Sequence, residues 1–298
     1  MTVRFGVHTG LQNTTVDELR SLWARIEDLG FDWISIWDHF YAADATGPNC
    51  LEAVASHAAL ACSTERVRCG SLVYCAGYRH PAVLANAMAT IDHLSGGRAD
   101  LGLGAGWAVN EYEAYGIPFP PAGERLDLLE ESVQCIRSLL RNETTSFQGR
   151  YFTLTDARCE PRPLQAELPM WIGGGGEKRT LRIAAQWADG WNVPFISPAE
   201  FARKRDVLAG HCADIGRDPA EIRGTINVGL ALDDDALGRQ FGAIAEHVRS
   251  GVLMGSGEAL VDGIGRYVEA GADQINIAMR APWELQGLEA LAGVLDQF

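Results

Sequence analysis

The chain has 298 residues, of which 47% are hydrophobic and 21% are charged, as is typical of a soluble globular protein rather than a disordered one. Its 25 Lys and Arg residues are outnumbered by 39 Asp and Glu residues, which gives a formal net charge of −14. This acidic balance argues against general binding to nucleic acids or membrane surfaces, because both require a basic face.

The first half of the chain alternates between strand-like and helical patterns. Short apolar runs predict strands at residues 3–8, 32–37, 67–75 and 98–103. Apolar residues at helical spacing predict helices at residues 15–29, 51–63, 81–94 and 124–140. Gly30 is a typical helix stop, and Pro81 is a typical residue of a first helical turn.

A segment at residues 144–159 interrupts this rhythm, because its aromatic residues alternate around Gly149 as in an inserted hairpin. The alternation then resumes. Strands are predicted at 170–172, 190–193, 222–232 and 274–278, and helices at 179–187, 198–215, 259–270 and 283–295, with an extra helix at 235–249.

Eight strand–helix units predict an α/β fold, a (β/α)8 TIM-type barrel with insertions, formed by one domain over residues 1–298. The alternative is a doubly wound open sheet, but no GxGxxG follows the first strand. In a barrel of this kind, the active site lies at the carboxyl ends of the strands. The residues to consider are therefore His8 and Thr9, Asp38 and His39, 71–75, 104–111, 173–178, Trp191 and Asn192, and 276–280.

The seven cysteines are odd in number and form no CxxC pair, which disfavours a disulfide framework or a zinc site. This pattern fits a reducing cytoplasm. The N-terminus has no signal-peptide pattern, and no apolar run approaches the ~18 residues of a membrane-spanning helix. We therefore expect a cytoplasmic protein without a membrane segment.

Two residues at the end of the second predicted strand are candidates for acid–base chemistry. His39 has an imidazole, whose ordinary pKa of about 6.5 lies near neutral pH. Asp38 is placed either to orient it or to contact a ligand. A solvated loop end would show the same pair, so position alone does not decide between function and structure.

Glycine-rich segments follow two further strands. Alternate glycines at 102, 104 and 106 remove side chains where a backbone or a ligand comes close, and Trp107 then offers an aromatic wall. Four consecutive glycines at 173–176 precede a predicted helix, with the cations Lys178, Arg179 and Arg182 at or near its start. Exposed peptide N–H groups, the helix dipole and these cations favour an anion such as a phosphate, although a flexible loop is the alternative.

These segments predict a barrel that binds a phosphate-bearing cofactor with an aromatic or apolar head group. A metal hydrolase is the competing enzyme class, but the seven histidines form no HxH or HExxH cluster, so we expect no metal.

The sequence resembles the luciferase-like monooxygenase superfamily, and within it the oxidoreductases that use coenzyme F420, a deazaflavin. The resemblance covers nearly the whole chain. It is carried by SIWDHF, YRHPAVLANAMATIDHLSGGRADLGLGAGW, NEYEAYGIPF, ERLDLLEE, FQGRYF and PMWIGGGGEKRTLRIAAQWADGWN. The fold of this superfamily is a (β/α)8 barrel with an insertion, which agrees with the count of elements.

The resemblance implies roles for individual residues. Asp38 would lie near the deazaflavin ring, and His39 would be the proton donor or hydride-site residue. Ser71 and Leu72 match a pair joined by a non-proline cis peptide bond that supports the ring. The implied cofactor contacts are Asp38, Ser71, Leu72, Ala105, Gly106, Trp107 and Asn110, with Gly174, Gly175, Gly176, Lys178 and Arg179 in the phosphate-binding segment.

One position departs from the sugar-phosphate dehydrogenases of this superfamily. They carry a catalytic acid where this chain has Trp107, and an indole cannot accept a proton. The resemblance therefore implies F420 but leaves the small organic substrate open.

Two other functions remain as alternatives: an FMN-dependent monooxygenase that uses reduced flavin and oxygen, and a non-catalytic flavin-binding protein. Only two of the 25 cations are lysines, Lys178 and Lys204, which suggests a GC-rich genome and favours the deazaflavin. The retained Asp38–His39 pair argues against the non-catalytic alternative. The apolar helix faces and the resemblance together predict a homodimer.

Overall fold

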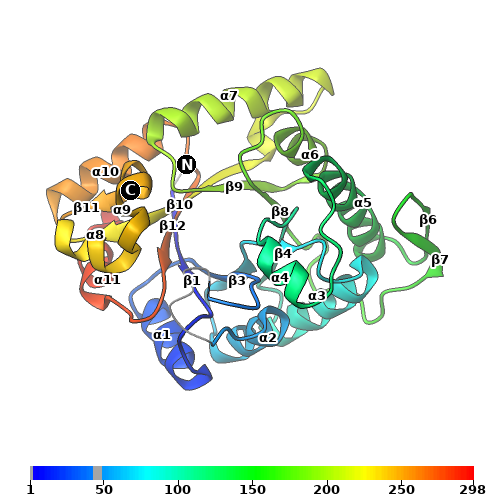
Figure 1. Ribbon diagram of the computed structural model, residues 1–298, viewed down its shortest axis with the longest axis horizontal. Coiled ribbons are helices and arrows are strands. Elements are labelled where there is room, and N and C mark those ends of the chain that lie inside the picture. The colour runs from blue at the N-terminus through cyan, green and yellow to red at the C-terminus, as the bar shows by residue number, and fades with distance from the viewer. Residues whose placement is uncertain (1–2, 43–48) are drawn as a thin grey trace.

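The computed structural model describes residues 3–42 and 49–298. Eight parallel strand positions close into a barrel in the order β1-β2-β3-β5-β8-β9-β10-β12, and β12 pairs with β1 (Figure 1). The predicted (β/α)8 barrel is therefore confirmed. The strands are β1 Arg4–Thr9, β2 Trp33–Ile36, β3 Arg68–Ser71, β4 Tyr74–Cys75, β5 Ala99–Gly104, β8 Met170–Gly173, β9 Gly190–Pro194, β10 Arg223–Ala231 and β12 Gln274–Met279.

Helices surround the barrel and follow the strands in turn (Figure 1). Local signals fix their ends: Thr15 and Glu18 form a capping box on α1, and Gly96 ends α3 in the left-handed conformation. The long helices are α1 Val16–Asp28, α2 Ala53–Ser63, α3 Pro81–Ser95, α5 Ala122–Arg141, α6 Thr180–Trp187, α7 Pro198–Asp214, α10 Glu258–Glu269 and α11 Leu285–Ala292. In the part of the chain that the structure describes, no helix is long and apolar enough to span a membrane.

The inserted hairpin is confirmed as β6 Thr145–Gln148 paired with β7 Thr153–Ala157. It projects beyond α5 on the outside of the barrel, at the right of Figure 1. The Glu131 carboxylate of α5 accepts hydrogen bonds from the peptide N–H groups of Arg150, Tyr151 and Phe152, which fixes the hairpin loop to the helix.

Three details differ from the prediction. The extra helix at 235–249 is broken into α8 Asp234–Phe241 and α9 Ala245–Val248, because Gly242 has φ +51° and ψ −129°, which no α-helix contains. The predicted strand at 67–75 is split into β3 and β4. Two short elements were not predicted: α4 Val109–Ala114, and β11 Val252–Met254, which pairs with the end of β10.

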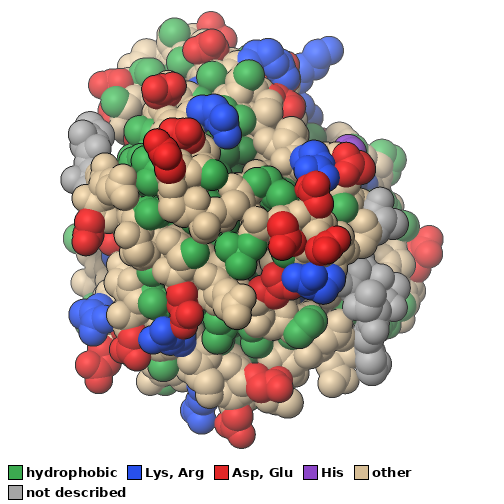
Figure 2. Space-filling model, turned by 90° about the vertical axis from the view of Figure 1, so that its left-hand side faces the viewer, with side chains coloured by type: hydrophobic (Ala, Val, Ile, Leu, Met, Phe, Trp, Pro, Cys, Tyr) green, Lys and Arg blue, Asp and Glu red, His purple; other side chains and the backbone are tan. Residues whose placement is uncertain are grey.

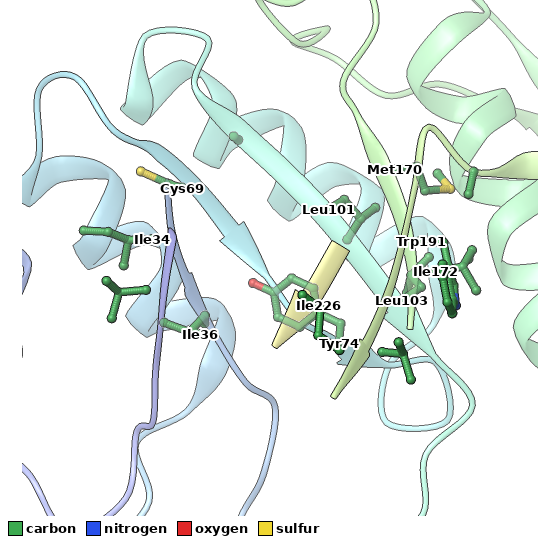
Figure 3. Packing of buried hydrophobic residues seen from close by; sticks show 14 of the residues in the cluster. Ile34, Ile36, Cys69, Tyr74, Leu101, Leu103, Met170, Ile172, Trp191 and Ile226 are labelled. Carbon is green, nitrogen blue, oxygen red and sulfur yellow. The ribbon is translucent and has the colours of Figure 1, made fainter. Parts of the chain in front are cut away.

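The main hydrophobic core lies between the strands and the helices. Along each strand, alternate residues point outward, and Figure 3 shows Ile34, Ile36, Leu101, Leu103 and Ile172 among these outward-facing side chains. They are fully buried, as are most residues of the inner faces of the helices. These outward-facing residues hold the helices against the barrel. The inward-facing residues are therefore not needed for that packing and can line the barrel interior.

Two tryptophans fill the N-terminal half of the barrel. The rings of Trp33 and Trp171 pack with their centroids 5.6 Å apart, and Trp33 Nε1 donates to Asp100 at 2.8 Å. Gly70 and Gly190 make room for these rings, since a Cβ at either position would overlap an indole. With that end closed, the open space of the barrel lies at the carboxyl ends of the strands.

Charged side chains are scattered over the surface. Figure 2 shows one face, on which acidic and basic side chains are interspersed with hydrophobic ones. Many of these charges form surface ion pairs, such as Arg25 with Glu289 and Arg249 with Asp234, which contribute little each to stability.

Candidate functional site

A large cavity of about 820 Å³ opens at the carboxyl ends of the barrel strands. This is where the barrel prediction placed the site, and the size suits a cofactor with a substrate. Its walls come from three regions: the ends of β1 to β5, the ends of β8 to β12, and the segment around α8 that follows β10. The α8 segment contributes Phe241 and Ile244 and was not predicted to belong to the site.

His39 lines the cavity and is held from behind by Glu111 of α4. Its Nδ1 lies 3.1 Å from both oxygens of the Glu111 carboxylate. Because an ionised carboxylate only accepts hydrogen bonds, Nδ1 carries the proton and donates, which leaves Nε2 as the ring nitrogen available to a ligand. The ring edges of Trp37 and Trp107 flank the imidazole at centroid distances of 6.2 and 5.3 Å.

Glu111 is buried, with a side chain only 2% exposed, yet its carboxylate is well satisfied. One oxygen accepts from the peptide N–H groups of Phe40 and Tyr41 at 3.0 and 3.1 Å. The Tyr78 hydroxyl donates to the other at 2.5 Å. Burial raises the pKa of this carboxyl, but the bonds from His39, Tyr78 and the peptide groups outweigh it and lower the pKa. Glu111 is therefore a fixed negative charge behind His39.

Asp38 also borders the cavity, but its carboxylate is engaged within the protein. Arg79 donates to both of its oxygens, at 2.6 and 3.0 Å, and the Cys75 peptide N–H donates at 2.9 Å. Arg79 also binds Glu52 of the α2 cap. The carboxylates of Asp38 and Glu52 raise the pKa of Arg79 against the effect of burial. Burial raises the pKa of Asp38, although Arg79 and the Cys75 peptide N–H act in the opposite direction. Asp38 thus joins the ends of β2 and β4.

The end of β3 corrects one expectation. The cis peptide bond joins Leu72 to Val73, not Ser71 to Leu72. The Leu72 peptide N–H still donates to Ile36, so the chain leaves the β ladder only after this residue. Leu72 and Val73 line the cavity, whereas Ser71 is fully buried and its hydroxyl bonds to the Gly102 backbone of β5. Contact between Ser71 and a cofactor stays a prediction.

At the end of β5, Ala105, Gly106 and Trp107 line the cavity, and Trp107 is 66% exposed. Asn110 lies on the exposed face of α4 and does not line the cavity. Gly106 has φ +78°, and a Cβ there would overlap the Tyr112 hydroxyl and the Cys75 sulfur. The alternate glycines thus permit close packing of the protein itself.

The glycine loop between β8 and α6 is held in place by two side chains. Trp191 Nε1 donates to the Gly174 carbonyl at 2.8 Å, and the Lys204 ammonium of α7 donates to the Gly175 carbonyl at 2.8 Å. With these carbonyls engaged, the peptide N–H groups of Gly175 and Gly176 have no acceptor among residues 3–42 and 49–298. This arrangement suits an anion at the start of α6.

The predicted cations of this loop are arranged differently from expectation. Gly174 lines the cavity, whereas Gly175, Gly176, Lys178 and Arg179 do not. Arg179 turns away to Asp127 of α5 at 2.6 Å, and Lys178 is exposed. Lys204 was not predicted to belong to the site. Lys204 lies 26 residues after Lys178 in the sequence, and only the packing of α7 on α6 brings it to the loop. The local sequence pattern therefore gave no sign of its role.

The floor of the cavity is polar. His8 lies there with its Nδ1 2.8 Å from the Ser35 hydroxyl. Burial, helped by nearby His39, lowers the pKa of His8 to about 3, so its imidazole is neutral at physiological pH. Asn192 and Asn227 complete the floor from β9 and β10. Within the described residues, no group of three His, Cys, Asp or Glu could hold a metal ion.

Comparison with known sequences gives a consistent result. The profile of the luciferase-like monooxygenase family matches residues 1–240. An F420-dependent glucose-6-phosphate dehydrogenase of Amycolatopsis mediterranei is 39% identical over 168 residues, which cover 56% of this chain and 50% of that protein. One of the same name from Kineococcus radiotolerans is 31% identical over 240 residues, covering 78% and 69%. The chain thus spans about half the length of the first of these relatives.

Solved structures share the fold. An F420-dependent secondary alcohol dehydrogenase, in complex with an F420–acetone adduct, superposes with a TM-score of 0.88 at 21% identity, covering 99% of this chain and 98% of that one. The coenzyme F420-dependent tetrahydromethanopterin reductase of Methanopyrus kandleri gives 0.83 at 20% identity, covering 98% of both chains. The monooxygenase RslO1 of Streptomyces bottropensis gives 0.76 at 19%, covering 97% and 98%.

Proposed function

The chain belongs to the luciferase-like monooxygenase family, and from this premise we propose that it is an oxidoreductase that exchanges a hydride between coenzyme F420 and a small organic substrate. Two of its relatives and two solved neighbours are F420-dependent enzymes, which supports this cofactor. When bound, the deazaflavin supplies the hydride chemistry. The protein orients the cofactor and the substrate, encloses them, and supplies or accepts a proton.

The observation that carries the proposal is the shape and chemistry of the cavity. Leu72, Val73 and Ala105 form an apolar wall, and Gly173 and Gly174 next to it present no side chains. At one end of this wall lie the unpaired peptide N–H groups of the glycine loop. A flat apolar ring with an attached phosphate fits such a slot, with the phosphate at the start of α6.

His39 has the geometry of a residue that handles a proton. Glu111 fixes the imidazole with Nδ1 protonated, so Nε2 is the atom that would give a proton to the substrate or take one from it. Asp38 acts as a positioning residue, since Arg79 and the Cys75 peptide N–H hold its carboxylate. His8, neutral on the floor, adds no charge to this environment.

The substrate half of the cavity favours an uncharged, largely apolar molecule. Trp37, Trp107, Phe241 and Ile244 line it. Of the cations on its border, Arg239 pairs with Glu284 and Arg280 lies over the Phe241 ring. The resemblance implies that Trp107 stands where the sugar-phosphate dehydrogenases have an acid. A sugar phosphate is therefore a poor match for this wall, despite the names of the relatives.

The test is a fluorescence titration of the purified protein with F420 and, separately, with FMN. The proposal predicts saturable binding of F420 at least about tenfold tighter than that of FMN, a difference of roughly 1.4 kcal/mol. Tighter binding of FMN, together with oxygen consumption when reduced FMN is supplied, would instead identify a flavin-dependent monooxygenase. Binding of either cofactor with no turnover of any carbonyl or alkene substrate would favour a non-catalytic flavin-binding protein.

We also propose that the protein is a cytoplasmic homodimer that acts without nucleic acid or membrane. The exposed apolar side chains Val83 and Leu94 on α3 offer one surface for pairing. Light scattering at micromolar concentration tests this proposal, and a monomeric mass would contradict it.

A further inference from the structure

A chain of buried amide side chains crosses the barrel interior just below the cavity. Gln274 of β12 donates to Asn276 at 2.8 Å, and Asn276 donates to the Asn227 carbonyl oxygen at 3.0 Å. Asn192 of β9 donates to the same oxygen at 3.0 Å. Barrel interiors are mostly filled by branched apolar residues, so a polar chain here calls for an explanation.

The Thr225 hydroxyl, at one end of this series of hydrogen bonds, determines which atom donates in each of them. The Thr225 hydroxyl donates its only hydrogen to the Trp191 carbonyl at 3.1 Å, so toward Asn192 it can only accept. The atom of Asn192 that faces it at 2.9 Å is therefore Nδ2. The second hydrogen of that Nδ2 is donated to Asn227 Oδ1. Among the described residues, the Asn192 Oδ1 then has no donor and the Asn227 Nδ2 has no acceptor.

These two unspent groups belong to side chains that line the cavity, and each residue is only 4% exposed. Asn276, which is fully buried, lies behind them and does not reach the cavity. A buried polar group without a partner is costly, so such a group persists where a ligand or water completes it. The floor thus offers one fixed acceptor and, bonded to it, one fixed donor.

We propose that Asn192 and Asn227 bind a ligand edge in which an N–H group adjoins a carbonyl, and that this edge is the pyrimidinedione end of the deazaflavin ring. Asn192 Oδ1 accepts from the ring N–H, and Asn227 Nδ2 donates to the neighbouring carbonyl oxygen. A carboxylate would leave Asn192 unsatisfied and an ammonium group would leave Asn227 unsatisfied, so a neutral edge with both functions is the match.

The position of Asn192 and Asn227 indicates that they bind the deazaflavin ring rather than the substrate. Asn192 pairs in register with Gly173 of β8, and its peptide carbonyl accepts from the Gly174 N–H. The pair therefore adjoins the side of the cavity where glycines leave room for a flat ring. This inference rests on the proposed function, and it concerns the ring edge that F420 and FMN share, so it does not select between them.

One substitution isolates the donor. In Asn227→Asp, one carboxylate oxygen still accepts from Asn192 and Asn276, while the other replaces the cavity-facing Nδ2 by an acceptor. The dissociation constant for F420, measured by fluorescence quenching, is expected to rise by about tenfold or more. The matched control is Asn142→Asp, which makes the same change at the exposed end of α5 and is expected to leave the affinity unchanged.

A second measurement uses the unmodified protein, so it stands even where the variant fails to fold. The deazaflavin riboside and its N3-methyl derivative are titrated side by side. Methylation removes the donor that Asn192 accepts, and the affinity is expected to fall by about tenfold or more. Equal affinities for the two rings would overturn the inference.

The outcomes separate this inference from the proposed function. F420 binding that neither Asn227→Asp nor N3-methylation changes would overturn the asparagine assignment and leave the proposed function standing. An unchanged F420 affinity in Asn227→Asp with a raised KM would assign the pair to the substrate and would also overturn it. Absence of any F420 or FMN binding would overturn both.

Discussion

The two walls of the cavity differ in how their polar groups are satisfied. On the β2–α4 side, Asp38, His39 and Glu111 find partners within the protein, apart from the one imidazole nitrogen that faces the cavity. On the β8–β10 side, the glycine loop and the floor asparagines leave peptide and amide groups unspent. Where the polar groups bond to one another, they hold one reactive atom in a fixed position. Where polar groups lack partners within the protein, a ligand can bind to them. We therefore assign proton handling to the first wall and cofactor binding to the second.

Removing the reactive atom gives the largest expected effect. His39→Ala deletes the imidazole whose Nε2 is available to a ligand, so turnover with an accepted substrate should fall by roughly 10²–10⁴-fold. Steady-state kinetics with F420 measures this change. Near-normal turnover in the variant would reduce His39 to a structural residue and leave the proton to solvent or substrate.

The Glu111 carboxylate behind His39 should also stabilise the fold. The pKa of Glu111 is lowered in the folded protein, so its carboxylate contributes stability above the ordinary pKa of about 4.5. This contribution is lost as the pH falls through the lowered pKa. Glu111→Gln should cost roughly 1.5–3 kcal/mol at pH 7, because it weakens hydrogen bonds to a charged acceptor. Urea unfolding at pH 7 and pH 4 should show the difference shrinking at the lower pH.

The matched control for this prediction is Glu113→Gln. Glu113 lies on the same short helix but is exposed. Its substitution should leave the free energy of unfolding nearly unchanged at both pH values. Equal costs for the two variants would mean that the bonds to Glu111 do not stabilise the fold.

For His57, which lies outside both walls, a lowered pKa destabilises the fold as the pH falls below about 6.5. His57 accepts at Nδ1 from the Tyr74 hydroxyl and donates from Nε2 to the Cys69 carbonyl, and burial lowers its pKa to about 4. The unfolded chain therefore binds the extra proton between about pH 6.5 and pH 4, so His57 alone should lower the stability by about 2 kcal/mol from pH 7 to pH 5, in addition to the loss caused by His8. His57→Gln should remove the His57 share and reduce the slope. An unaltered slope in urea unfolding would show that other groups cause it.

The smallest predicted effect identifies the cation that serves the glycine loop. Lys204→Met removes the ammonium group that holds the Gly175 carbonyl, which should loosen the loop and weaken F420 binding by about three- to tenfold. Lys178→Met, at the exposed lysine, should change the affinity less. A larger loss with Lys178→Met would restore the role that the sequence alone suggested for it.

The sequence predicted the fold well because the barrel depends on local periodicity. Eight apolar runs and the helices between them are visible one element at a time, as is the hairpin around Gly149. The helix predicted at 235–249 was wrong because its apolar spacing was read without the cost of Gly242 within it. The cis peptide bond was displaced by one residue because a resemblance transfers a position only as well as the alignment does.

The site was predicted only in part, because its partners are distant in sequence. Asp38 and His39 follow a strand and could be placed at the barrel mouth. Their partners Arg79 and Glu111 lie 41 and 72 residues further along, and nothing local links them. The sequence placed Asn192 at the barrel mouth but did not reveal its pairing with Asn227, because that pairing depends on the Thr225 hydroxyl donating its one hydrogen to the Trp191 carbonyl.

The division between the two walls is tested most directly by measuring the F420 dissociation constant of three proteins side by side. Gly175→Val places a branched side chain against Lys204 and beside the unpaired peptide groups, and should weaken binding by about tenfold or more. Gly210→Val, at an open position on α7, is its control. His39→Ala should bind F420 within about twofold of the unmodified protein. An unchanged affinity in folded Gly175→Val, or a loss of affinity in His39→Ala as large as that expected for Gly175→Val, would contradict the account.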